Sequence, residues 1–362
     1  MKKLSVILIF FTLFSSVTTA NVSAENFFAP ISAECAALYQ VENGEFIYQK
    51  NEKMRHPMAS TTKIMTALIA IEKSNLDEIV SVNPMAVGIE GSSVYLQSGE
   101  EISMENLLYA LLLQSANDAA TQIAIHIGGS IEEFCNMMNE RAKSLGLNDT
   151  HFTNPHGLDN ENHYTSAHDL TIIAATAMED ETFREIVSCK QKTIKTNTPD
   201  GEITRVLVNH NKLLRIYDGA VGVKTGYTKK TGRCLVSAAS RDNVNFICVT
   251  LDAPNDWDDH SKLLDYAFSR FSRHIIAKEK EIYFDIPLLN GNTDKIAVAN
   301  LNEMSCVVCD NDCSVILKTD INGPLIAPIR AGDAVGYIYA YRNGIKVASS
   351  PLIVLDNVND RK

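Results

Sequence analysis

The chain lacks a surplus of basic residues, an internal repeat and, beyond its N-terminus, any apolar run long enough to cross a membrane. Its 362 residues include 33 Lys and Arg against 44 Asp and Glu, which gives a net charge of −11. A protein this acidic has no electrostatic reason to bind nucleic acid. The composition therefore argues against a nucleic-acid-binding protein, a repeat protein and a protein with several membrane spans.

Regularly spaced cysteines are also lacking, although the chain has eight. Cys306, Cys309 and Cys313 lie close together and could bind a metal or carry one disulfide. Three sulfurs without a nearby fourth ligand make a weak metal site, so we expect no metal or other cofactor. The other five are scattered in mostly apolar surroundings and are expected to be buried small hydrophobes: Cys35, Cys135, Cys189, Cys234 and Cys248.

The N-terminus has the pattern of a secretory signal peptide. Two lysines precede an apolar run from Leu4 to Val17, and small residues follow up to Ala24. We expect residues 1–24 to be removed after Ala24, with Ala20 as an alternative site. An uncleaved anchor is the other reading, but the apolar run is short for a membrane span. The mature protein is thus expected to be extracytoplasmic, in the cell wall or at the outer face of the membrane.

An apolar content of 45% and the length predict two packed domains, residues 25–274 and 275–362. The first is expected to be α+β, with an antiparallel sheet of about five strands flanked by helices, because the links between its last three strands are too short for crossover helices. Predicted strands are 36–40, 46–49, 220–225, 233–240 and 244–251, and predicted helices are 63–73, 104–113, 119–127, 131–145, 170–178 and 260–271.

Turn chemistry refines this outline. Asn43-Gly44 between the first two strands is typical of a two-residue hairpin loop, and Ser166 to Asp169 resembles a capping box before a helix. The stretch before residue 220 is interpreted as a charged connection. From about Glu281, short β-type runs between Asn-Gly and Asp-Asn turns predict a small all-β sandwich domain.

Ser60 and Lys63 are the first candidate catalytic pair. At a spacing of three, both side chains share one helical face, about 5 to 6 Å apart. A serine at a helix start is usually only an N-cap, but burial of Lys63 would lower the pKa of its amine and make it a base. We expect Ser60 to be the nucleophile, with its own N–H facing the developing oxyanion.

Two further triplets complete the candidate site. Ser115-Ala116-Asn117 lies between two apolar helices, where it could simply end one and begin the next; as a site element, Ser115 would relay a proton and Asn117 would hold Lys63 and a substrate amide. Lys224-Thr225-Gly226 closes a strand, and an exposed lysine is its plain interpretation. Alternatively Lys224 and Thr225 bind a carboxylate, Gly226 admits an added strand, and the Tyr227 N–H is the second oxyanion donor.

Together the S-x-x-K, S-x-N and K-T-G motifs resemble those of serine-type D-alanyl-D-alanine carboxypeptidases, the low-molecular-mass penicillin-binding proteins. The resemblance extends over nearly all of the mature chain, including Asn154-Pro155-His156-Gly157 and, in the second domain, Pro328 to Asp333. It implies removal of the terminal D-Ala from peptidoglycan pentapeptide stems through an acyl-enzyme on Ser60, and inhibition by β-lactams.

Two features depart from this family's pattern. Relatives commonly end in an amphipathic helix that contacts the membrane, whereas residues 358–362 show no apolar stripe, which leaves membrane contact open. His210 also stands where some relatives carry Arg, which could make a carboxylate contact weaker or pH-dependent.

Four other functions were weighed. A class A β-lactamase requires a carboxylate base, and residues 154–162 contain no E-x-x-x-N pattern. A zinc carboxypeptidase could use His163, His168 and Asp169, but their spacing suits helix capping better than metal ligation. An inactive scaffold is disfavoured because every motif residue is present. A transpeptidase differs only in its acceptor, and no residue distinguishes it.

Overall fold

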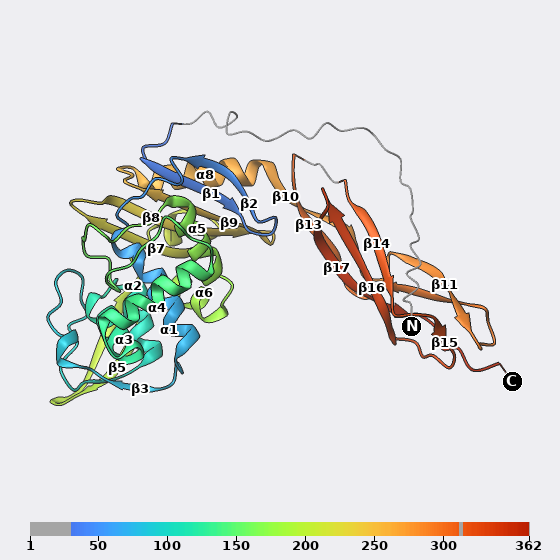
Figure 1. Ribbon diagram of the computed structural model, residues 1–362, viewed down its shortest axis with the longest axis horizontal. Coiled ribbons are helices and arrows are strands. Elements are labelled where there is room, and N and C mark those ends of the chain that lie inside the picture. Colours follow the sequence, from blue (N-terminus) through green and yellow to red (C-terminus); the bar gives the residue numbers. More distant parts are fainter. Residues whose placement is uncertain (1–29, 311–313, 362) are drawn as a thin grey trace. The chain divides into compact units, whose positions relative to one another are not determined.

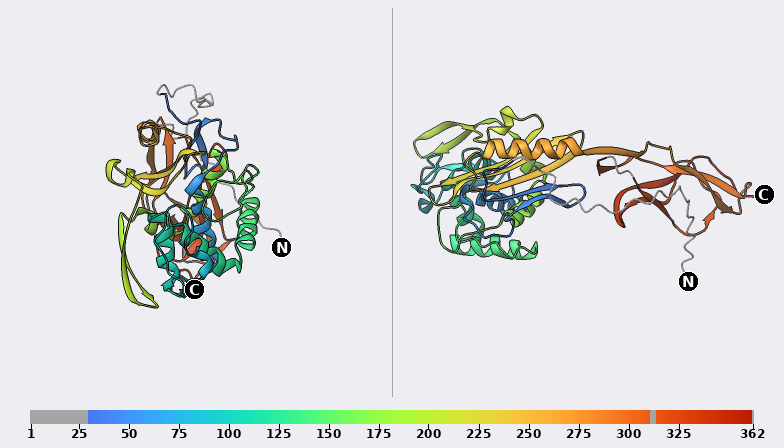
Figure 2. Two further views of the ribbon diagram at one scale, coloured as in Figure 1. Left: turned by 90° about the vertical axis from the view of Figure 1, so that its left-hand side faces the viewer. Right: turned by 90° about the horizontal axis from the view of Figure 1, so that it is seen from above.

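The computed structural model describes residues 30–310 and 314–361, which divide into two compact units (Figures 1 and 2). The larger unit covers residues 30–241 and 245–269, and the smaller covers the chain from Arg270 onward. The proposed signal peptide lies outside the described residues. Within the described ranges, no helix has both the length and the apolar character needed to span a bilayer.

The larger unit is built on a five-stranded antiparallel sheet with strand order β2-β1-β9-β8-β7. This confirms the predicted sheet, since each predicted strand is found with ends shifted by at most three residues. Strand β7 is at the edge, and its outer side has no neighbouring strand among the described residues. The strands are β1 (Cys35–Gln40), β2 (Glu45–Lys50), β7 (Ala220–Thr228), β8 (Gly232–Arg241) and β9 (Val244–Leu251).

The loop between β1 and β2 is longer than predicted. Gln40 pairs with Glu45, so four residues form the loop instead of two. The Gln40 side chain accounts for this, because its Oε1 accepts a hydrogen bond from the Asn43 N–H at 2.7 Å and thereby closes a wider turn. Gly44 then turns the chain with φ +67°.

Helices cover both faces of this sheet (Figure 1). On one face lies α8 (Asp256–Arg270), whose buried His260 bonds through its two ring nitrogens to Ser237 of β8 and Thr250 of β9. It begins four residues before the predicted start, in a first turn rich in aspartates that suit a helix N-terminus. The opposite face carries α1 (Lys63–Lys73), α2 (Met104–Leu113), α3 (Asn117–Gly128), α4 (Ile131–Ser144), α5 (Ala167–Ala177) and α6 (Glu181–Ser188).

Half of the predicted capping box is present at α5. The Ser166 hydroxyl accepts a hydrogen bond from the Asp169 N–H at 3.1 Å, so the helix begins at Ala167 rather than at Leu170. The Asp169 carboxylate does not reach back to Ser166. It accepts instead from the Asp149 N–H and from the Thr150 hydroxyl, both at 2.9 Å, and so ties the preceding loop to the helix.

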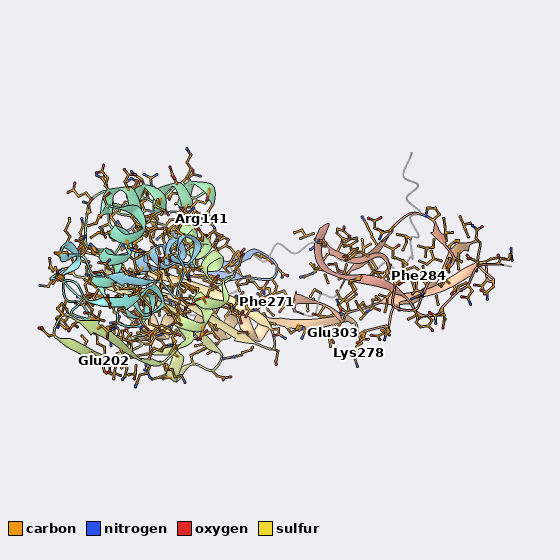
Figure 3. The ribbon with its side chains drawn as sticks, turned by 90° about the horizontal axis from the view of Figure 1, so that it is seen from below. Arg141, Glu202, Phe271, Lys278, Phe284 and Glu303 are labelled. Atoms are coloured by element: carbon orange, nitrogen blue, oxygen red, sulfur yellow. The ribbon has the colours of Figure 1, made fainter. Side chains whose placement is uncertain are left out.

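The interpretation of the stretch before residue 220 as a plain connection is wrong. It holds α6, a long hairpin and the short helix α7 (Leu213–Ile216), and the hairpin joins a second sheet of order β3-β4-β5-β6. Glu202 at the start of β6 is labelled on this hairpin in Figure 3 and pairs with Lys195. The strands escaped prediction because only one face of β5 is buried and it is mostly threonine. They are β3 (Ile79–Ser81), β4 (Glu101–Ser103), β5 (Gln191–Thr198) and β6 (Gly201–Val208).

The smaller unit is all-β, as predicted, but its strands begin at Phe271, ten residues before Glu281. A two-stranded and a six-stranded sheet enclose a separate apolar core, against which Phe284 packs (Figure 3). The strands are β10 (Phe271–Ala277), β11 (Tyr283–Leu289), β12 (Lys295–Asn300), β13 (Met304–Cys309), β14 (Ile316–Ile321), β15 (Leu325–Ile326), β16 (Ala334–Arg342) and β17 (Ile345–Val354).

The cysteines of the larger unit largely follow expectation. Four of the five are buried thiols, whereas Cys189, at the end of α6, is only half-buried. Burial raises the pKa of the Cys234 thiol to about 12, which keeps it protonated and unreactive. Cys306 and Cys309 lie on β13. Cys313 lies outside the described residues, so the state of that group stays a prediction.

Candidate active site

The segment that carries Ser60 is a 3-10 turn, Ala59–Thr62, which continues into α1 at Lys63. Ala59 has φ +45°, a left-handed conformation that is costly for a residue with a side chain. Gly157 supports this bend from behind, since a Cβ at that position would lie 1.9 Å from the Ala59 carbonyl oxygen. The turn places the Ser60 Oγ 3.1 Å from the Lys63 Nζ.

The Lys63 amine is fully buried and held at three points. Its Nζ lies 2.7 Å from the Asn117 Oδ1 and 2.6 Å from the His156 carbonyl oxygen, in addition to Ser60. Both oxygens can only accept, so they take two N–H groups. A neutral amine then has its lone pair left for the Ser60 hydroxyl, which is the arrangement of a base beside its nucleophile.

Electrostatics favour that neutral form. Burial, followed by repulsion from Lys224, lowers the pKa of Lys63 well below its usual value, and the attraction of Asp118 only partly opposes this. The predicted role of Lys63 thus has a physical basis in the position of the amine, although the role itself remains a prediction.

Ser115 and Asn117 lie where α2 ends and α3 begins. Ser115 has φ +59°, and Asn117 is fixed by its N–H to the Ser92 carbonyl oxygen at 2.7 Å and by its Nδ2 to the Glu90 carbonyl oxygen at 2.5 Å. The neighbouring Asp118 carboxylate accepts bonds from the same loop, from the Ser93 hydroxyl at 2.6 Å among others. The helix junction therefore also positions the loop that contributes Ser92 to the site.

The third motif lies on the edge strand β7. Lys224 is buried with its Nζ 3.0 Å from the Thr225 carbonyl oxygen, and burial lowers its pKa to about 7. Gly226 is required by close packing, since a Cβ there would lie 3.0 Å from the Ser60 nitrogen. Strand β7 is thereby held directly against Ala59–Thr62, the turn that carries the predicted nucleophile Ser60 and is called the nucleophile turn below.

A cleft of about 950 Å³ opens along these three segments. Five predicted residues line it, namely Ser60, Ser115, Thr225, Gly226 and Tyr227, whereas Lys63, Asn117 and Lys224 are buried beside it. All eight predicted residues are thus brought into one region. The remaining lining residues are Ser92, His210, Lys212, Arg233, Pro254, Asn255, Asp256, Trp257 and Asp258.

One wall of the cleft was not anticipated from the sequence. Arg233 pairs with the buried Asp256 carboxylate at 2.9 Å, and its guanidinium lies 5.7 Å from the centre of the Trp257 ring. No sequence motif marks these residues, because they come from β8 and from the start of α8. Trp257 is the only tryptophan of the chain, and this was the one feature of the sequence that could have drawn attention to this wall.

The histidines considered for zinc have other partners. The backbone N–H of Thr153 donates to Nδ1 of the buried His163 at 3.0 Å, so the ring proton is on Nε2 and donates to the Thr62 hydroxyl oxygen at 2.8 Å. Thr62 in turn donates to the Ala59 carbonyl oxygen. His168 pairs instead with Asp169. His163 therefore supports the nucleophile turn, a role that the sequence did not reveal.

His210 lines the cleft, as its place in the chain suggested. Burial, and then the nearby Lys224, lower the pKa of His210 below its ordinary value. The imidazole is therefore neutral at neutral pH, so His210 brings a hydrogen-bonding group to the cleft but no charge.

Sequence comparisons identify known proteins that this chain resembles. A family model described as D-alanyl-D-alanine carboxypeptidase matches residues 19–255, and one described as the C-terminal domain of penicillin-binding protein 5 matches residues 271–360. The D-alanyl-D-alanine carboxypeptidase DacF of Bacillus subtilis (strain 168) is 32% identical over 336 residues, which cover 90% of this chain and 86% of the relative. A D-alanyl-D-alanine carboxypeptidase of Streptomyces sp. (strain K15) is 35% identical over 64% of this chain.

Solved structures give the same picture. The D-alanyl-D-alanine carboxypeptidase DacD from Francisella tularensis superposes with a TM-score of 0.65 at 26% identity, over 97% of this chain and 98% of that chain. The Streptomyces K15 DD-transpeptidase superposes with a TM-score of 0.64 at 35% identity, over 67% of this chain and 98% of its own.

Proposed function

Because the chain belongs to the D-alanyl-D-alanine carboxypeptidase family, as its motifs predicted, we propose that it removes the terminal D-alanine of peptides ending in D-Ala-D-Ala. The observation that carries this proposal is the environment of Lys63. Two carbonyl-type oxygens hold its N–H groups and direct its remaining position at the Ser60 hydroxyl, 3.1 Å away.

In the first step, the Ser60 Oγ attacks the carbonyl carbon of the penultimate D-Ala while its proton moves to the Lys63 Nζ. The carbonyl oxygen becomes an oxyanion, which the N–H groups of Ser60 and Tyr227 stabilise. The C–N bond then breaks, and the departing amine takes a proton that Lys63 supplies through the Ser115 hydroxyl. D-Alanine leaves, and the remaining peptide is an ester of Ser60.

In the second step, water hydrolyses this ester. Lys63, neutral again after the first step, accepts a proton from the water as its oxygen adds to the ester carbon. Collapse of the intermediate returns a proton to the Ser60 oxygen and frees the shortened peptide. Through both steps the Asn117 Oδ1 and the His156 carbonyl oxygen hold two N–H groups of Lys63, which leaves its third position for proton exchange.

Substrate binding is assigned to the edge of β7. The terminal carboxylate of the peptide accepts hydrogen bonds from Lys224 and Thr225, and the peptide lies along the open side of the strand as an added strand. Peptidoglycan pentapeptide stems present such an end. Penicillins imitate it and acylate Ser60, which agrees with the match to a penicillin-binding protein domain.

We also propose that residues 1–24 direct export, so that the enzyme acts on the cell wall outside the cytoplasmic membrane. The basic and apolar segments up to Ala24 support this. N-terminal sequencing of the protein recovered from the producing cell should begin at Glu25. A protein that retains Met1 would contradict it.

The decisive experiment measures D-alanine release from a diacyl-L-Lys-D-Ala-D-Ala peptide by the mature protein and by Ser60→Ala. We expect the variant to lose about four orders of magnitude or more in kcat, because the nucleophile is missing. Fluorescent penicillin should label only the unaltered protein. Release that survives in Ser60→Ala would refute the assignment of the nucleophile, and an unaltered protein with neither release nor labelling would indicate a scaffold.

Transpeptidation is the second candidate, since the Streptomyces K15 structure bears the name DD-transpeptidase and matches 67% of this chain at 35% identity. Both reactions share the acyl-enzyme and differ in whether water or an amine accepts the acyl group. Addition of glycylglycine to the assay distinguishes them. A transpeptidase converts most of the acyl-enzyme to the new amide, and a carboxypeptidase continues to release the shortened acid.

A further inference from the structure

Three side chains from separate segments converge near the start of β1. They are Glu34, directly before that strand, His56, four residues before Ser60, and Asp252, directly after β9. One nitrogen or oxygen of each lies within 4.8 Å of the others. The Glu34 Oε2 is 3.6 Å from the His56 Nε2, which is too long for a hydrogen bond.

The imidazole of His56 points into this cluster with its Nε2, which has no hydrogen bond to any residue that the structure describes. His56 is only 9% exposed. Its Nδ1 lies 2.7 Å from the Pro57 carbonyl oxygen, which can only accept, so Nδ1 carries a proton. The lone pair of Nε2 is then directed at two carboxylates. A backbone carbonyl that fixes Nδ1–H in this way is the usual support of a metal-binding histidine.

The backbone around Asp252 is shaped to place its carboxylate there. Asp252 has φ +48°, an uncommon conformation for a residue with a side chain. The neighbouring Gly232 leaves the necessary space, since a Cβ on it would lie 2.0 Å from the Asp252 Oδ1. Lys50 on the adjacent strand β2 does not neutralise the cluster directly, because its ammonium donates to the Ala33 carbonyl oxygen at 2.6 Å.

We propose that Glu34, His56 and Asp252 bind one divalent transition-metal ion of the zinc type. An imidazole nitrogen with two carboxylate oxygens suits such an ion better than Mg²⁺ or Ca²⁺, which prefer oxygen ligands alone. Ligands about 2.1 Å from a tetrahedral ion lie about 3.4 Å from one another. The His56 and Glu34 atoms, 3.6 Å apart, are close to this separation. The Asp252 oxygen lies within 4.8 Å of both and closes the remainder by a small movement of its carboxylate, with water as the fourth ligand.

The ion acts as a clamp rather than in the chemistry. It joins the start of the central sheet to the segment leading to the nucleophile turn and to the segment that continues into Pro254 to Asp258 of the cleft wall. Because the three ligands converge only in the folded chain, binding stabilises the fold in proportion to metal occupancy.

The experiment uses the full mature protein, freed of metal with EDTA, and titrates it with Zn²⁺ by calorimetry and by thermal unfolding. We expect one ion per chain and a zinc-dependent rise in Tm. His56→Gln should lose that ion, and Glu34→Gln should weaken its binding about tenfold or more. Co²⁺ at the same site should give an absorption band that His56→Gln lacks.

His126→Gln is the matched control. His126 also faces a carboxylate, with its Nε2 3.3 Å from Glu78, but no third ligand joins this pair among residues 30–310 and 314–361. The His126→Gln substitution should change neither the number of zinc ions bound per chain nor the zinc-dependent rise in Tm. Penicillin labelling of each variant checks its folding, and Glu34→Gln alone decides the matter if His56→Gln does not fold. Zinc binding that is absent, or equal in Glu34→Gln and the unaltered protein, overturns the proposal.

Discussion

Lys63 and Lys224 are two buried amines in one site. The proposed reaction requires Lys63 to be neutral and Lys224 to be positively charged. In the proposed mechanism, Lys63 acts as a base only without its proton, and Lys224 binds the substrate carboxylate only with its proton. Burial lowers the pKa of both, that of Lys224 to about 7. The proposed reaction is therefore expected to have a pH window whose acid side is set by Lys63 and whose alkaline side is set by Lys224.

The first prediction follows from this window. The kcat/KM for a peptide with a free terminal carboxylate should fall as pH rises above about 7, because the free enzyme loses the charge on Lys224. In Lys224→Arg the alkaline fall should disappear while the acid side remains, since a guanidinium stays protonated. A substrate with a terminal amide is the control and should lack the alkaline fall. An unchanged profile in Lys224→Arg would show that another group titrates.

A second prediction concerns the link from His163 to the nucleophile turn. Thr62→Val keeps the shape of the side chain but leaves the His163 Nε2–H without its acceptor, which should cost about 1–3 kcal/mol of stability. It should also slow acylation by penicillin, because the Ala59 carbonyl oxygen loses its hydrogen bond. Urea unfolding and acylation kinetics test both effects.

Thr176→Val is the control for that experiment. Its hydroxyl bonds only to the Ile172 carbonyl oxygen within α5, away from the cleft. It should leave the acylation rate unchanged. Equal acylation rates in Thr62→Val and the unaltered protein would show that His163 stabilises the fold without affecting the position of Ser60.

At the scale of single residues, the sequence predicted the site residues that belong to short motifs. Ser60, Lys63 and Asn117 are linked by hydrogen bonds because a three-residue helical spacing and a helix junction dictate their placement. The carbonyl of His156 could not be assigned, because a backbone oxygen has no signature in a sequence. Arg233 and Trp257 were missed for a related reason, since they meet only through tertiary packing.

Among the elements, the turn Ala59–Thr62 depends most on its neighbour. Gly157 has φ +91° and no room for a Cβ, whereas Gly146 has φ +75° with nothing within 4 Å of the same position. Gly146→Ala should cost only the backbone strain, about 1 kcal/mol. Gly157→Ala should cost several times more and reduce penicillin acylation, because the Ala59 carbonyl must move.

Thermal unfolding and acylation rates of the two alanine variants provide the comparison. A pair with equal losses would show that the contact with Ala59 is not tight.

Prediction of elements from the sequence succeeded where apolar residues are dense. Helices α1 and α2 begin and end as predicted, since buried leucines and isoleucines define them clearly. The prediction missed the hairpin of β5 and β6. A strand whose solvated face carries Lys, Thr and Asn has too few apolar residues to show a period of two. The start of α8 was placed late because aspartates at a helix N-terminus resemble a polar loop.

At the scale of the whole molecule, the proposed chemistry is confined to one of the two units. Every residue assigned to catalysis lies in the larger unit, and the Streptomyces K15 structure matches 67% of this chain while using 98% of its own. We therefore expect a protein of residues 25–270 to be labelled by penicillin at a rate within about twofold of the full chain. Fluorescent penicillin gives this rate directly. A truncated protein that folds but reacts at least tenfold more slowly would show that the all-β unit contributes to the site.

The open edge of β7 has a consequence for the behaviour of the protein in solution. Sheet edges are usually protected by a bulge, a proline or an inward-facing charge, because two bare edges from different molecules can join. Lys224 is such an inward-facing charge, but in the proposed mode of binding a bulge or a proline along Thr225 to Tyr227 would obstruct the substrate. Lys229 and Lys230, exposed just beyond the strand, bring like charges together whenever two such edges approach. In the proposed mode of binding, the sheet edge that receives the substrate is thus also open to self-association, and repulsion between these exposed lysines opposes that association from outside the binding segment.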